Sequence, residues 1–122
     1  MNLRYCSGFL LAVALLAVGC KQDQGPVEVP VDQASAGVKS SFAGANAELK
    51  QAADAAAQDM QQGNYVQSYE KLEELGASGD LTPEQRQRLG ESQAAVLKKL
   101  NEAAATGDEA AAKALEVHRS RK

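Results

Sequence analysis

Glycine and proline divide most of this chain into short helical segments. After Val38 the sequence is dominated by alanine, glutamine, glutamate and lysine, which are strong helix formers, while β-branched residues are sparse. Residues that end or interrupt helices recur through this part: Gly63, Gly76, Gly79, Pro83 and Gly107. The pattern predicts an all-α fold of short antiparallel hairpins with about four helices.

The first expected helix runs from Val38 or Ser41 to Gln62. Its apolar residues recur at steps of three and four, which places them on one face. This face contains Phe42, Ala45, Leu49, Ala52, Ala56 and Met60. Gly63 is expected to end the helix, because glycine adopts the left-handed conformation of a helix C-terminus without strain.

A second helix is expected to start at Asn64, with Gln67 at capping-box spacing. Its apolar face consists of Tyr65, Tyr69, Leu72 and Leu75. Because Tyr69 shares helical spacing with the two leucines, we expect its ring to lie in the core rather than on a docking surface.

The two remaining helices have clear boundaries. Thr82 is expected to cap the third helix, with Pro83 in its first turn and Gln85 completing a capping box. This helix should end near Thr106-Gly107, and the fourth should run from Glu109 to about Arg119.

The N-terminal stretch has the layout of a secretory leader. Arg4 precedes an apolar run from Phe9 to Val18, which is shorter than the about 20 residues that a bilayer span needs. The run leads into Ala17-Val18-Gly19-Cys20. One interpretation of this layout is an ordinary cleaved signal peptide in which the cysteine is coincidental.

These four residues resemble the lipobox of bacterial lipoproteins, although Ala17 stands where that family favours leucine. The resemblance implies that signal peptidase II cuts between Gly19 and Cys20 and that Cys20 carries the lipid. Residues 1–19 would then be the signal peptide. Residues 20–37, which contain Pro26 and Pro30, would be a lipidated flexible linker, and residues 38–122 the α-helical domain.

The residue after the lipidated cysteine bears on the location. In two-membrane bacteria an aspartate at this position retains lipoproteins in the inner membrane, and this chain has Lys21 instead. The expected location is therefore the cell envelope, lipid-anchored, at the outer membrane and facing the periplasm.

The hairpin around Gly63 resembles a tetratricopeptide repeat. Gly63-Asn64-Tyr65 matches the turn sequence of that family, and Leu89-Gly90 matches its Leu-Gly pair one period of about 34 residues on. The second turn, Gly107-Asp108, comes later than the period predicts. The resemblance covers roughly residues 49–119 and implies tetratricopeptide-like hairpins, with a generic four-helix arrangement as the alternative.

Composition argues against several kinds of site. The net charge of −3 is unfavourable for binding nucleic acid. The lone histidine, His118, is expected to complement the dipole at the end of the last helix, and no second histidine or spare cysteine is present for a metal. The sequence offers no phosphate loop or acid–base pair, so we expect no cofactor, no metal and no catalytic activity.

The predicted function is that of a membrane-anchored envelope lipoprotein with a small helical protein-interaction domain. Its expected partners are the membrane, through the lipid, and a protein client or a second copy. The alternative is a structural tether, because Ser120-Arg121-Lys122 resembles the end of murein lipoprotein, whose terminal lysine is joined to peptidoglycan.

We expect Cys20→Ser to block acylation and to leave an unprocessed precursor or a soluble protein, because serine lacks the thiol that receives the lipid. Metabolic labelling with a fatty acid measures this directly. Cys6→Ser, within the leader, is the matched control and should retain the label. Label on the Cys20→Ser protein would contradict the assignment.

Overall fold

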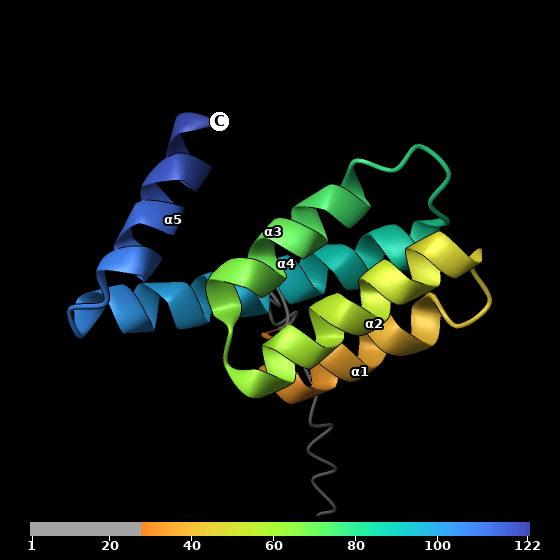
Figure 1. The fold of residues 1–122 in the computed structure, drawn as a ribbon, viewed down its shortest axis with the longest axis horizontal. Coiled ribbons are helices and arrows are strands. Elements are labelled where there is room, and N and C mark those ends of the chain that lie inside the picture. The colour runs from red at the N-terminus through yellow and green to blue at the C-terminus, as the bar shows by residue number, and fades with distance from the viewer. Residues whose placement is uncertain (1–27) are drawn as a thin grey trace, which may run out of the picture.

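The computed structural model describes residues 28–122, which form five helices and no strands (Figure 1). The helices are α1 (Val31–Ser41), α2 (Ala47–Gln62), α3 (Tyr65–Gly76), α4 (Pro83–Ala105) and α5 (Glu109–Ser120). The all-α prediction is confirmed for this part of the chain. The leader, the Gly19–Cys20 cleavage site and linker residues 20–27 lie outside the described residues.

Local sequence explains most of the helix ends. Thr82 and Gln85 form the predicted capping box at the start of α4, with backbone-to-side-chain distances of 3.1 and 2.9 Å. The Asp108 side chain caps α5 by accepting a hydrogen bond from the Ala111 amide at 3.0 Å. Gly63 (φ 79°) and Gly107 (φ 98°) adopt the left-handed conformation that glycine tolerates best.

The capping box expected at Asn64 and Gln67 does not form. The Asn64 side chain makes no cap hydrogen bond, and its ψ of 65° departs from the extended conformation of most N-caps. Its backbone amide instead donates to the Asp59 carbonyl at 2.9 Å, closing the C-terminus of α2. Asn64 therefore contributes a backbone hydrogen bond to the C-terminus of α2, but its side chain does not cap the N-terminus of α3.

The prediction of one helix from Val38 or Ser41 to Gln62 was wrong. The chain breaks after Ser41 and α2 begins after Asn46, whose side chain accepts a hydrogen bond from the Leu49 amide at 2.9 Å. The expected linker, residues 20–37, also extends too far, because α1 already begins at Val31. Pro30 immediately precedes it, at a helix end where the missing amide hydrogen costs no internal hydrogen bond.

The longest helix, α4, is the common packing partner in the fold. Both α1 and α3 pack against α4 on one side and against α2 on the other, so the first four helices form a ring. The fifth helix packs on the C-terminal end of α4 and stands apart from the ring (Figure 1).

Tetratricopeptide-like detail is not confirmed. That resemblance implies two comparable hairpins, α2–α3 and α4–α5, but α4 has 23 residues and α5 only 12. The helix α1, which the resemblance does not include, supplies one of the four sides of the ring.

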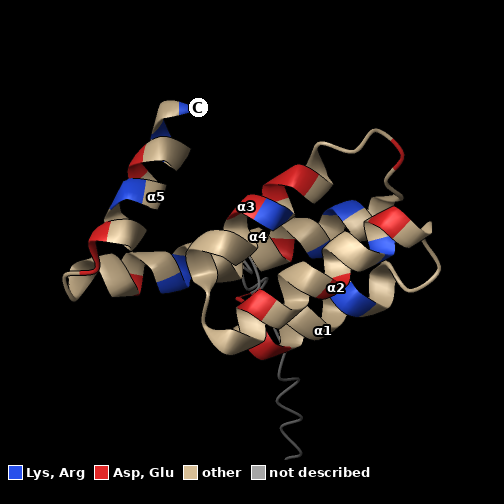
Figure 2. Cartoon of the chain, in the orientation of Figure 1, with Lys and Arg blue, Asp and Glu red and all other residues tan. Residues whose placement is uncertain are grey.

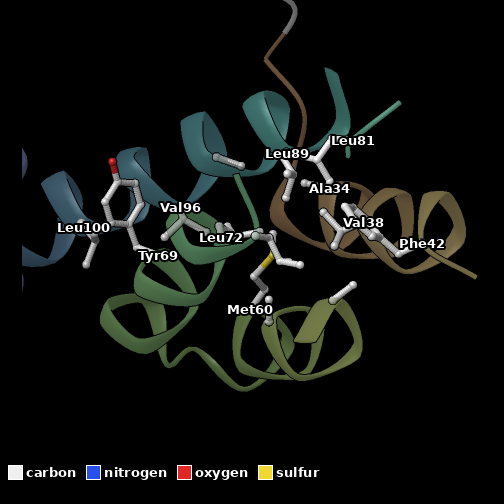
Figure 3. Packing of buried hydrophobic residues seen from close by; sticks show 14 of the residues in the cluster. Ala34, Val38, Phe42, Met60, Tyr69, Leu72, Leu81, Leu89, Val96 and Leu100 are labelled. Carbon is white, nitrogen blue, oxygen red and sulfur yellow. The ribbon is translucent and has the colours of Figure 1, made fainter. Parts of the chain in front are cut away.

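The core fills the space inside the ring and continues toward α5. Val38 and Phe42 lie at one end, and Tyr69, Val96 and Leu100 at the other (Figure 3). The predicted α3 face is confirmed, since Tyr69, Leu72 and Leu75 are buried and Tyr65 is partly buried. Small residues such as Ala34, Ala53 and Ala56 let the helix backbones approach closely.

Buried polar groups in this core are satisfied. Ser92 on α4 donates to the Ala34 carbonyl of α1 at 3.2 Å, and Gln85 donates to the Ser41 carbonyl at the same distance. Within residues 28–122 no buried side-chain nitrogen or oxygen lacks a hydrogen-bond partner. The interior therefore avoids the penalty of unpaired polar groups.

Phe42→Ala should lower the free energy of unfolding by about 3–5 kcal/mol, because it removes a completely buried ring. Urea unfolding of the leaderless chain, followed by circular dichroism, measures this. Gln58→Ala, at an exposed position on α2, is the control and should change stability little. A near-parental midpoint for Phe42→Ala would show that the α1–α2 turn is not part of the cooperative core.

Candidate functional site

A groove separates α3 from α5. Ala111 and Leu115 bury the inner face of α5, whose main packing partner is α4, and α5 touches α3 at few points. The groove between α3 and α5 has a volume of about 310 Å³. Its apolar lining comes from Val66, Ala110, Ala114 and Val117.

One end of the groove is closed by contacts across it. The Tyr69 hydroxyl and His118 Nδ1 lie 2.5 Å apart, and the two rings meet edge to face with centroids at 5.4 Å. Next to them, Arg121 Nη1 donates to Glu73 Oε2 at 2.7 Å. The Arg121 side chain is largely exposed, so this ion pair contributes little stability. The partly buried contact between Tyr69 and His118 is the firmer link between α3 and α5.

Burial and then the nearby Glu73 carboxylate raise the pKa of Tyr69 to about 12. The phenol consequently keeps its proton at neutral pH. It is able to donate that proton in a hydrogen bond when Nδ1 of His118 carries no hydrogen. The role that we assign to Tyr69 and His118 is structural: their hydrogen bond holds α5 beside α3.

The two walls of the groove differ in charge. Glu70 and Glu73 line the α3 side, whereas Lys113 and Arg121 line the α5 side. Both helices also carry charges of the other sign away from the groove lining, as the colours of α3 and α5 in Figure 2 show. Glu73 and Arg121 already pair with each other. The ion pairs found within residues 28–122 involve neither Glu70 nor Lys113, so each wall retains one charge that is not paired there.

A larger hollow, of about 550 Å³, lies between Glu28–Asp32 and neighbouring parts of α2, α3 and α4. Its lining begins at the first described residue, and Glu28 and Lys98 within it already form an ion pair with each other. The α3–α5 groove is bounded by two well-defined helices, and we take it as the candidate site.

The residues singled out from the sequence differ in their relation to this groove. Gly19 and Cys20 lie outside the described residues. His118 lies in the last turn of α5, as expected, but its contact with Tyr69, 49 residues earlier, was not foreseen. The periodicity of α3 indicates that Tyr69 points inward, while no pattern in the sequence shows which side of α5 will face it.

Comparison with family models, with curated proteins and with solved structures finds no match to this chain. None of the helices in residues 28–122 has both the length and the apolar character needed to cross a membrane. The same residues contain no group of three or more metal-ligating side chains placed to hold an ion.

The raised pKa of Tyr69 predicts a specific loss of stability in alkali. The folded chain holds the phenolic proton up to about pH 12, and an ordinary tyrosine only to about pH 10. The stability that this difference in pKa gives the folded chain is fully present below pH 10 and is lost as the pH rises to about 12. Tyr69→Phe should remove it, so the stability difference between the two proteins should shrink across this interval.

Phenolate absorbance gives a second measurement. Subtracting the titration of Tyr69→Phe from that of the parent isolates this one phenol. A difference curve centred near pH 10 would contradict the buried position beside Glu73.

Proposed function

We propose that this chain is a membrane-anchored envelope lipoprotein whose helical domain binds protein and has no catalytic activity. The observation that carries the interaction role is the α3–α5 groove. It combines an apolar lining with one acidic and one basic wall. Such a surface suits a protein helix that presents small apolar residues flanked by charges of both signs.

The exposure of Val117 supports this use of the groove. Among the described residues, Val117 is the large hydrophobic residue that is exposed to solvent, with an exposed fraction of 40%. It also lines the groove. A single exposed valine is ordinary on a protein surface. Together with Val66, Ala110 and Ala114 it supplies the apolar part of the groove lining, which a partner would cover.

The anchoring part of the proposal rests on Ala17-Val18-Gly19-Cys20 at the end of an apolar leader. Lipidation there would hold the domain at a membrane surface, at the outer membrane on the expectation from Lys21. Two acyl chains or more give stable anchoring, whereas one chain binds only reversibly.

The tether alternative has less support. Murein lipoprotein, which the C-terminal residues resemble, is expected to have one unbroken coiled coil. Residues 28–122 instead form five helices joined by turns, with the left-handed residues Gly63 and Gly107 at two of them. Peptidoglycan attachment at Lys122 therefore remains the second candidate, with no geometric feature that favours it.

A photo-crosslinking residue at position 117 tests the interaction role in the full chain inside cells. We expect a covalent adduct with protein, because Val117 lines the groove and is exposed. The same residue at Gln58, an exposed position on α2, is the control and should give little adduct. Absence of any adduct from position 117 would count against the proposed function.

A further inference from the structure

We infer that the occupant of the α3–α5 groove is a helix of another protein that runs antiparallel to α3 and α5. The side of this helix that faces the groove carries a cationic residue about two turns before an acidic one, with small apolar residues between them. This inference rests on the proposed function and states the chemistry of its partner.

The contacts within the chain show how the groove is oriented. Tyr69 meets His118, and Glu73 meets Arg121 further along both helices. The two helices therefore run in the same direction along the groove. The end that these contacts close lies toward both C-termini, and the open end lies toward both N-termini.

The two wall charges that form no ion pair within residues 28–122 lie at different heights in the groove. Glu70 directly follows Tyr69, so it lies at the closed end. Lys113 precedes His118 by five residues, so it lies at the open end, level with the start of α3. At about 1.5 Å per residue the two charges are roughly 9 Å apart along the groove, which corresponds to about two turns of a helix.

The dipole of α3 has the same polarity as these two charges, because a helix is positive at its N-terminus and negative at its C-terminus. No acidic residue lies in the first turn of α3, no basic residue lies in its last turn, and Asn64 provides no side-chain cap. The second half of α3 instead carries Glu70, Glu73 and Glu74. Its own side chains therefore leave the dipole without compensation, and the only ion pair formed by these three glutamates within residues 28–122 is that of Glu73 with Arg121.

An antiparallel helix is complementary to both ends of the groove. Its positive N-terminal end would lie beside Glu70, and its negative C-terminal end beside Lys113 and the uncapped N-terminus of α3. A cationic side chain facing Glu70 and an acidic one facing Lys113 would add two attractive charge pairs. The dipole of α5 matters less, because Glu109 in its first turn and Arg119 in its last turn offset it.

The apolar part of the lining limits the side chains that fit between the two charges. Val66, Ala110, Ala114 and Val117 lie there. The groove volume of about 310 Å³ is at the lower end of the range for ligand pockets. A helix face of alanine and valine suits this space better than one with aromatic rings.

Two synthetic helical peptides of about 20 residues, a length at which isolated helices form, test this inference. Both have a face of alanine and valine. The first carries a lysine two turns before a glutamate, and the second has these two residues exchanged. Binding to the full chain in detergent is measured by fluorescence anisotropy. The first peptide should bind about tenfold more tightly, because the exchange replaces two attractive charge pairs by two repulsive ones.

Glu70→Lys combined with Lys113→Glu should reverse this preference, so that the second peptide binds more tightly. A reversed preference requires a folded groove, so loss of folding does not imitate it. The matched control is Glu74→Lys combined with Arg119→Glu, which makes the same charge changes at exposed positions of the same helices outside the groove lining. This control should keep the preference of the parent. Detergent affects both peptides equally, because they have the same composition.

Equal binding of the two peptides, or tighter binding of the second to the parent, would overturn the proposed direction and order of charges. The same conclusion would follow from a preference that Glu70→Lys with Lys113→Glu leaves unchanged. Binding of neither peptide would overturn the helical occupant. The crosslinking experiment at position 117 decides separately on the proposed function, which a failure of the peptides leaves standing.

Discussion

The fold depends on polar side chains of α4 that donate hydrogen bonds to the carbonyl oxygens of the helices beside it. Ser92 reaches Ala34 on α1, Gln85 reaches Ser41 at the end of α1, and Gln93 reaches Leu72 on α3 at 3.4 Å. The alanines of the core allow helix backbones to lie close together, and these side chain-to-carbonyl hydrogen bonds form only at short range. Leaving the buried Ser92 hydroxyl without its partner would cost about 1–3 kcal/mol.

The same arrangement explains why a groove exists. The ring of α1 to α4 uses the first part of α4, and α5 packs on the remaining C-terminal part (Figure 1). Because α5 packs mainly on α4, with Ala111 and Leu115 buried, its interface with α3 is small and includes the contacts of Tyr69 with His118 and of Glu73 with Arg121. The remaining space between α3 and α5 is the groove, which has apolar residues in its lining and charges of opposite sign on its two walls.

Local chemistry predicted several of the helix ends, although the capping box expected at Asn64 and Gln67 does not form. Thr82 and Gln85, Gly63 and Gly107 mark ends that the structure confirms. The break between α1 and α2 was missed, because Phe42 and Ala45 continue the helical spacing across a turn. The α3–α5 contact could not be derived either, since it depends on how α5 is rotated on α4, which is decided by packing far from Tyr69 in the sequence.

The early start of α1 limits how far the domain could travel from a membrane. For a chain held at Cys20, only the residues up to Pro30 separate the lipid from Val31. Even at full extension such a segment spans at most roughly 40 Å. Copies on the same leaflet would thus share a thin layer above the lipid, which raises their local concentration far above that of a freely diffusing domain. Even a weak surface on α3 and α5 would meet its partner often under that confinement.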